Sequence, residues 1–312
     1  MDVETAIKVE GLRHRFKDHE AVAGVSFRVP ARAIHGFVGP NGAGKTTTLK
    51  IVGTLLAPQT GVVEVFGEDV ARKVKRVRRQ IGYMPDHFAM YKQMTVFEYL
   101  DFFAAAYGQS VRKRNGTIDD VLQLTDMSQR ADSMIKGLSR GMQQRISLAR
   151  VLVHDPKLLL LDEPASGLDP RARIEMKELL KALCSMGKTI LISSHILSEL
   201  GDMCNKIGIL EHGELLASGE VGEIMARVRE VQELRIEVFE GADEAEAVFR
   251  ESPGLTDLER AGNEFQMQSR LGRAELAALH SRLQAAGVKL LFFEQDKGSL
   301  EDVFLSVTKG GI

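Results

Sequence analysis

The residues from Gly39 to Thr47 have the types and spacing of a phosphate-binding loop. The stretch reads GPNGAGKTT, fits the pattern GxxxxGK[ST], and lies between an apolar run at 33–38 and a predicted helix at 46–56. Glycines leave backbone N–H groups free to contact phosphate oxygens, and the N-terminus of a helix attracts anions. The residues that we expect to bind phosphate are Gly39, Pro40, Asn41, Gly42, Ala43, Gly44, Lys45, Thr46 and Thr47.

Two side chains of this loop add chemistry of their own. Lys45 is expected to reach the β and γ phosphates of a nucleotide, and the Thr46 hydroxyl is expected to bind Mg²⁺. A glycine-rich turn beside a lysine is the alternative interpretation. The strand predicted before the loop and the helix predicted after it favour the phosphate site.

Asp162 and Glu163 follow the fully apolar run at 158–161, which is typical of a strand buried on both faces. Carboxylates at the end of a buried strand are costly unless they are used. In a phosphate-loop protein Asp162 would hold Mg²⁺ through water, and Glu163 would orient or deprotonate the attacking water. An exposed acidic turn is the alternative.

His195 follows another predicted strand, at 189–193, so it would lie in the crevice where open α/β sheets bind ligands. Alone it would be read as an ordinary loop histidine. Phe16 lies between strands predicted at 6–9 and 25–29, which form an antiparallel flap. Its ring is either free to stack on a base or packed in the core, and the sequence leaves both interpretations open.

A basic segment runs from Val70 to Arg79. Its three valines have the spacing of a helix with one face toward the core, so a solvated basic face is favoured over a nucleic-acid patch. The basic residues are Arg72, Lys73, Lys75, Arg76, Arg78 and Arg79.

The composition limits the class of protein. The chain has 312 residues, is 44% hydrophobic and carries a formal net charge of −2, which fits two domains and argues against a general nucleic-acid binder. Cys184 and Cys204 have no disulfide or metal-site spacing. No apolar run approaches the ~18 residues of a membrane span, and the N-terminal residues are acidic, so we expect the chain neither to cross a membrane nor to be exported.

The predicted elements divide the chain in two. Strands alternate with helices up to a hairpin at 205–219 and a helix from Glu220 to Arg229, which indicates an α/β fold. Residues 232–308 then read as strand, helix, strand, strand, helix, strand and helix, the pattern of a small α+β domain. The expected domains are 4–228 and 232–310.

Five motifs in this order resemble an ATP-binding cassette (ABC) ATPase. They are the loop at 39–47, LSRGMQQR at 138–145, LLLLDEP at 158–164, SGLDP at 166–170 and SSHIL at 193–197. The resemblance implies a P-loop NTPase core with an antiparallel β subdomain and a helical insert at about 87–155. It also implies a head-to-tail dimer, expected to be a homodimer, that holds each ATP between the loop of one subunit and the LSRGM signature of the other.

The resemblance also implies roles for single residues. Phe16 would stack on adenine, Asp162 would be the second magnesium-site residue, Glu163 the catalytic carboxylate and His195 the γ-phosphate sensor. Across the dimer, Ser139 and Gly141 would contact the γ-phosphate and Asp169 would be the cross-dimer residue.

Two departures from the family pattern affect these roles. Asp86 stands where the family has glutamine; it can meet Mg²⁺ through water but cannot donate a hydrogen bond when ionised. Arg140 and Met142 stand in the signature in place of glycine and glutamine, so we expect weaker or slower nucleotide sandwiching.

The stretch from Met84 to Gly108 and the closing SLEDVFLSVT look like the ATPase subunits of bacterial exporters that have a separate permease. This likeness implies ATP and Mg²⁺ as cofactors, an integral membrane permease as partner, no nucleic acid, and a cytoplasmic location on the inner face of the membrane. The aromatic helix at 96–107 and the loop before it would dock on the permease through Phe88 and Phe97.

Two other function classes compete with transport. One is a cassette that switches an assembly on nucleic acid, but residues 47–138 leave no room for the coiled-coil insertion usual there. The other is a small-molecule kinase, which leaves the signature and the 166–170 segment unexplained.

Overall fold

The structure is a computed structural model that describes residues 4–87, 89–201, 203–228 and 232–296. The chain divides into two compact units, Met1–Glu220 and Val221–Ile312. Each unit has its own hydrophobic core, so we describe them separately.

A six-stranded sheet forms the centre of the first unit. Its order is β10 (Glu214–Glu220), β9 (Lys206–Glu211), β3 (Ile34–Val38), β8 (Thr189–Ser194), β7 (Leu158–Asp162) and β6 (Ile81–Met84). Neighbouring strands are parallel except for the β9–β10 hairpin. Every residue of β3, β7 and β8 is buried, as expected for strands that are covered on both faces. The predicted hairpin and central strands are confirmed.

A second, antiparallel sheet has the order β2 (His19–Pro30), β1 (Thr5–Phe16), β4 (Thr60–Val65) and β5 (Glu68–Asp69). The predicted flap is therefore present, with strands longer than expected. Two short helices belong to this part of the unit, α1 (Lys45–Val52) and α2 (Val74–Gln80).

Helix α2 begins four residues later than its valine spacing predicted. The Asp69 carboxylate accepts hydrogen bonds from the N–H groups of Ala71 and Arg72, at 2.8 and 3.0 Å. This local side-chain bonding holds residues 70–73 in a turn, because it offers the backbone an alternative to the helix.

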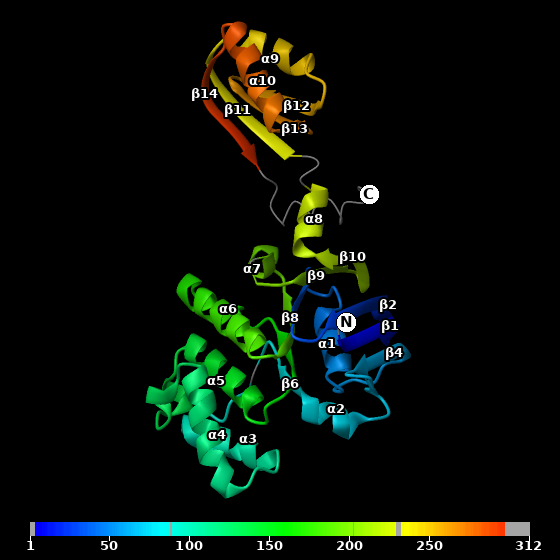
Figure 1. Cartoon of the computed structure of the whole chain (residues 1–312), viewed down its shortest axis with the longest axis vertical. Coiled ribbons are helices and arrows are strands. Elements are labelled where there is room, and N and C mark those ends of the chain that lie inside the picture. The colour runs from blue at the N-terminus through cyan, green and yellow to red at the C-terminus, as the bar shows by residue number, and fades with distance from the viewer. Residues whose placement is uncertain (1–3, 88, 202, 229–231, 297–312) are drawn as a thin grey trace. The chain divides into compact units, whose positions relative to one another are not determined.

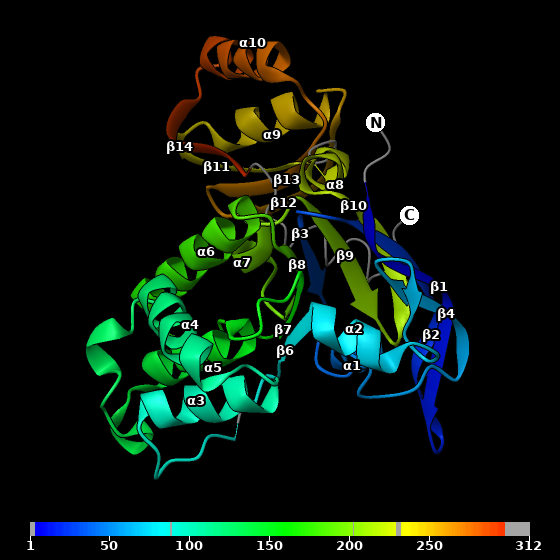
Figure 2. The same cartoon turned by 60° about the horizontal axis from the view of Figure 1, so that its bottom comes forward.

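The helical part contains α3 (Val96–Ala106), α4 (Val111–Leu124), α5 (Arg140–Leu152), α6 (Pro170–Ser185) and α7 (Leu197–Gly201), with short 3₁₀ turns at Ser128–Arg130 and Ile135–Gly137. Figures 1 and 2 show α3 to α6 on the opposite side of the six-stranded sheet from β1, β2 and β4. Helix α4 begins at Val111, and its Arg114 pairs with Asp101 of α3 at 2.6 Å. In the part of the chain that the structure describes, no helix is both long and apolar enough to span a bilayer.

The second unit begins with α8 (Val221–Val228) and continues as β11 (Gln232–Glu240), α9 (Ala242–Arg250), β12 (Leu255–Ala261), β13 (Glu264–Ser269), α10 (Arg273–Ala285) and β14 (Lys289–Asp296). The antiparallel sheet order β12-β13-β11-β14 is that of a ferredoxin-like βαββαβ fold. The predicted order is confirmed through β14. The last predicted helix and the SLEDVFLSVT segment lie outside the described residues.

Candidate active site

The predicted phosphate loop connects β3 to α1. Gly44 is the N-cap of α1 with φ 96°, a left-handed conformation, and a Cβ there would lie 2.4 Å from the Ala21 carbonyl oxygen. Only glycine fits this position without strain. The Nζ of Lys45 donates to the carbonyl oxygens of Gly39 and Pro40, at 2.6 and 3.2 Å. The lysine is therefore held over the loop.

A pocket of about 240 Å³ opens above this loop. It is lined by Phe16, His19, Ala21, Pro40, Asn41, Gly42, Ala43, Gly44, Lys45, Thr46, Thr47, Asp86 and Glu163. The Phe16 side chain is 45% exposed and packs its ring on the edge of His14, with centroids 4.6 Å apart. Of the two interpretations left open for Phe16, the structure favours the ring at the pocket over the ring in the core.

Asp162 ends β7 and is almost fully buried. Its Oδ1 accepts hydrogen bonds from Thr46 Oγ1 at 3.0 Å and from Ser193 Oγ at 2.7 Å. Burial raises the pKa of this carboxyl, although both hydrogen bonds oppose the rise. Burial and the nearby Asp162 likewise raise the pKa of the Tyr83 hydroxyl.

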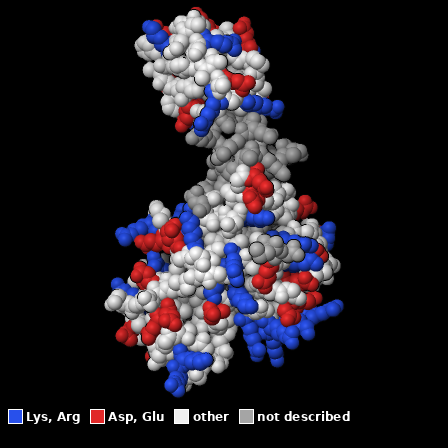
Figure 3. All heavy atoms as spheres, viewed as in Figure 1, with Lys and Arg blue, Asp and Glu red and all other residues white. Residues whose placement is uncertain are grey.

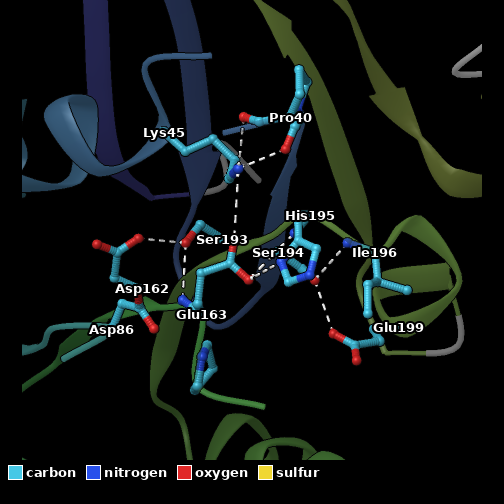
Figure 4. Close-up of polar contacts among 12 residues, drawn as sticks. Pro40, Lys45, Asp86, Asp162, Glu163, Ser193, Ser194, His195, Ile196 and Glu199 are labelled. Carbon is cyan, nitrogen blue, oxygen red and sulfur yellow. Dashed lines mark hydrogen bonds and ion pairs between the residues drawn. The ribbon is translucent and has the colours of Figure 1, made fainter. Parts of the chain in front are cut away.

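Glu163 joins the loop lysine to the predicted histidine, as Figure 4 shows. Its Oε1 lies 3.5 Å from Lys45 Nζ, and its Oε2 accepts from His195 Nδ1 at 2.7 Å. Its φ of 51° is left-handed, and its N–H donates to Ser193 Oγ at 3.0 Å. Glu163 is thus held both through its backbone N–H and through its carboxylate oxygens.

Protonation in this cluster follows from the same contacts. Because a carboxylate oxygen only accepts, Nδ1 of His195 carries the hydrogen of this bond. Burial lowers the pKa of Lys45, and the charge of Glu163 partly opposes that effect. The Lys45 ammonium and the Glu163 carboxylate therefore depend on one another electrostatically.

A further cluster, which the sequence did not point to, holds the backbone beside His195. Ser194 Oγ donates to Glu199 Oε2 at 2.9 Å and accepts from the N–H of Ile196 at 3.0 Å. Glu199 is buried, and its Oε1 lies 3.4 Å from Arg173 Nε of α6. The residue types gave no signal. A serine just before a histidine and a glutamate four residues after it are both common on helices and loops.

Asp86 lies at the rim of the loop pocket, and its carboxylate lies 2.8 Å from the ring of His87. Phe97, one of the two residues expected to dock on a permease, is partly buried in α3, and its N–H donates to Ala131 O. The other, Phe88, lies outside the described residues.

The predicted signature residues lie at helix starts outside the loop pocket. Ser139 caps α5 and accepts from the N–H of Met142 at 3.3 Å. Asp169 caps α6 and accepts from the N–H of Ala172 at 3.0 Å. A Cβ added at Gly141 would lie 3.6 Å from Leu168 and 3.7 Å from Ala172, which is ordinary van der Waals contact.

These two helix starts touch. The guanidinium of Arg140 lies over Gly167, where a Cβ would be 2.5 Å from Arg140 Cζ. Gln144 of α5 also donates to the carbonyl oxygen of Pro164, in the loop after Glu163. The signature helix and the loop after β7 are therefore packed as one surface.

Comparisons with known proteins agree with this arrangement. The family model described as "ABC transporter" matches residues 22–166. The chain is 34% identical over 305 residues to the Nod factor export ATP-binding protein I of Rhizobium sp. (strain N33), covering 98% of this chain and 97% of that one. It is 31% identical to the daunorubicin/doxorubicin resistance ATP-binding protein DrrA of Streptomyces peucetius, covering 97% and 92%.

Solved structures give the same picture for the first part of the chain. The structure described as the ATP binding subunit of an ABC transporter is 29% identical, with a TM-score of 0.64, and the match covers 72% of this chain and 93% of that one. The dimeric structure of MJ0796, a bacterial ABC transporter cassette, is 25% identical with a TM-score of 0.63 and covers 69% and 98%.

Proposed function

This chain belongs to the ATP-binding cassette transporter family and is an ATPase subunit that binds ATP, and from that premise we propose that it energises a separate membrane permease that exports a small molecule. The observation that carries the proposal is the convergence of Lys45, Thr46, Asp162, Glu163 and His195 at the loop pocket. Two relatives are named for Nod factor export and for daunorubicin/doxorubicin resistance, which supports export as the direction.

ATP would bind with its phosphates on residues 39–47 and its base on Phe16. The cradle fits, because the N-terminus of α1 points free N–H groups and a positive dipole end at the pocket. The side chains near Thr46 also fit Mg²⁺, because the Thr46 hydroxyl and the carboxylates of Asp162 and Asp86 offer only oxygen ligands. Bound Mg²⁺ would neutralise phosphate charge.

Hydrolysis needs a group that positions water and accepts its proton. Glu163 has this role in our proposal, because its carboxylate is held between Lys45 and His195 and faces the pocket. Lys45 stabilises charge that develops on the phosphates. His195 orients Glu163 through Nδ1–H and turns Nε2 toward the γ-phosphate.

The second half of the nucleotide site would come from a second copy of the chain. Ser139, Gly141 and Asp169 lie at the starts of α5 and α6, where helix N-terminal N–H groups are available to an anion. We assign them to the partner's ATP in a head-to-tail homodimer. The dimeric cassette structure supports this assembly.

We assign the cassette to residues 4–228, with a helical insert at 87–155, and an accessory domain to 232–310. This assignment counts α8 with the cassette, although the compact units divide before it, between Glu220 and Val221. The permease would dock on α3 and the preceding loop, which places the chain on the inner face of the membrane. Exposed rings of Tyr91, Phe102 and Tyr107 support this surface.

The experiment that tests the function is co-purification from solubilised membranes with Glu163→Gln. The variant is expected to bind ATP, to hydrolyse it at least ~100-fold more slowly, and to retain a polytopic membrane protein. Ser185→Ala, an exposed change at the end of α6, is the matched control and should hydrolyse ATP normally. A soluble or nucleic-acid partner in place of a membrane protein would refute transport.

A further inference from the structure

The basic segment before β6 forms an exposed surface that the proposed ATPase site does not use. We define the α2 surface as Arg72, Lys73, Lys75, Arg76, Arg79 and the neighbouring Leu55. All five basic side chains are exposed, while Val70 and Val77 are buried beneath them. The valines therefore fix which side of the helix faces outward.

Much of the positive charge on this surface has no acidic partner within the described parts of the chain. Arg72 and Arg76 pair with Asp69 and Glu68, at 3.9 and 3.1 Å. Lys73, Lys75 and Arg79 have no acidic partner among the residues that the structure describes. Cationic side chains that lie close together without acidic partners repel one another. An anionic surface beside them reduces this repulsion, so the basic surface favours an anionic partner.

The α2 surface also has an apolar neighbour. Arg78 donates to the Oγ1 and the carbonyl oxygen of Thr54, at 2.8 and 3.0 Å, which fastens α2 to the segment after α1. The next residue, Leu55, is 52% exposed. Cations beside an exposed leucine are typical of protein surfaces that lie against lipid headgroups.

The position of α2 within the first unit is also consistent with contact to lipid headgroups. Figure 1 shows α2 and α3 at the same end of the unit, and Figure 3 shows Lys and Arg gathered at that end. Helix α3 carries the exposed Phe102 and Tyr107 that we assigned to the permease. A cassette docked through α3 would turn α2 toward the bilayer.

We propose that the α2 surface binds the anionic phosphate headgroups of membrane lipids beside the permease. This inference rests on the proposed transport function for its biological setting, but the binding itself needs no permease. Nucleic acid is the less favoured partner, because the described α2 surface has no aromatic side chain on which a base stacks.

The test is sedimentation of the full chain with vesicles of phosphatidylcholine, with or without phosphatidylglycerol. The variant Lys73→Gln, Lys75→Gln, Arg79→Gln is expected to bind the anionic vesicles roughly 100-fold more weakly, from about 5-fold for each charge. A control with the same charge change elsewhere on the unit, Arg13→Gln, Arg28→Gln, Lys181→Gln, should bind nearly as well as the unchanged chain. Both variants should keep normal ATP turnover in solution.

Three outcomes would overturn the inference. The first is equal binding of the unchanged chain to neutral and anionic vesicles, and the second is equal weakening of vesicle binding in the two triple variants. The third is an α2 variant that loses binding to DNA but keeps binding to anionic vesicles. Added salt should weaken the vesicle complex, since screening shortens the reach of exposed charges. If Glu163→Gln retains no membrane protein while vesicle binding behaves as expected, the transport function fails and the lipid surface stands.

Discussion

Replacing Ser193 by alanine tests whether the buried Asp162 carboxylate depends on its neighbours. The Ser193 hydroxyl is fully buried, donates to Asp162 Oδ1 at 2.7 Å and accepts from the Glu163 N–H at 3.0 Å. A hydrogen bond to a charged group contributes about 1.5–3 kcal/mol, and a neutral one about 1 kcal/mol. Ser193→Ala should therefore lower the free energy of unfolding of the first unit by roughly 2–4 kcal/mol at pH 7.

The assay is urea unfolding followed by far-ultraviolet circular dichroism, because the chain has no tryptophan. Ser185→Ala serves as control: its hydroxyl donates to one carbonyl at an exposed helix end, so its effect should stay within about 0.5 kcal/mol. A loss for Ser193→Ala no larger than that of the control would refute the assigned energies.

The pH dependence gives a second check with a definite sign. Burial raises the pKa of Asp162 above its ordinary value of 3.8, and the Ser193 hydrogen bond opposes this rise. The folded state thus binds this proton more tightly than the unfolded state. The free energy of unfolding therefore falls as pH increases from the ordinary pKa of the carboxyl to its raised pKa in the folded state. The substitution raises the pKa further, so the difference between Ser193→Ala and the unchanged protein should shrink on acidification toward pH ~4. A difference independent of pH would show that Asp162 is not its cause.

Three pairs of substitutions test separate parts of the site. Gly44→Ala brings a Cβ within 2.4 Å of a backbone carbonyl oxygen and should weaken the binding of a fluorescent ATP analogue at least ~10-fold. Gly42→Ala has a left-handed φ but open space around the Cβ, so it should cost only about 1 kcal/mol of stability. Equal losses of affinity for the analogue in the two variants would contradict this. Asp169→Ala should remove about 1 kcal/mol in thermal unfolding, and Asp169→Ser should restore it, because both side chains cap a helix; an unchanged melting temperature for alanine argues against capping. Glu199→Leu should reduce turnover about 10-fold with ATP affinity kept, and Glu199→Gln, which retains the acceptor, should reduce it less; loss of affinity alone would exclude a positioning role.

The sequence predicted the strand end at Asp162 and the helix start at Lys45 well, because each has a local signal. The apolar run at 158–161 has only one comfortable place, inside a sheet covered on both faces, and the acidic pair after it must then lie at the strand end. The phosphate loop is local in the same sense, since its spacing alone sets the turn and the start of α1.

Contacts between distant residues were not predictable. Ser193 lies inside a predicted strand, and nothing in its type indicates that it bonds to both Asp162 and the Glu163 N–H. The valine spacing predicts a helix from Val70, but the Asp69 side chain bonds to the backbone there and α2 begins at Val74. The sequence leaves the place of Phe16 open for a related reason, because the exposure of its ring depends on where His14 and the loop pocket lie.

The packing of Arg140 on Gly167 separates two reasons for a glycine at that position. A Cβ at position 167 would lie 2.5 Å from Arg140 Cζ, but the guanidinium is the end of a flexible side chain and can move away. The φ of Gly167 is 67°, a left-handed conformation that disfavours any side chain whatever its neighbours. The backbone of the loop before α6 therefore requires the glycine, and a smaller residue at position 140 would not remove that requirement.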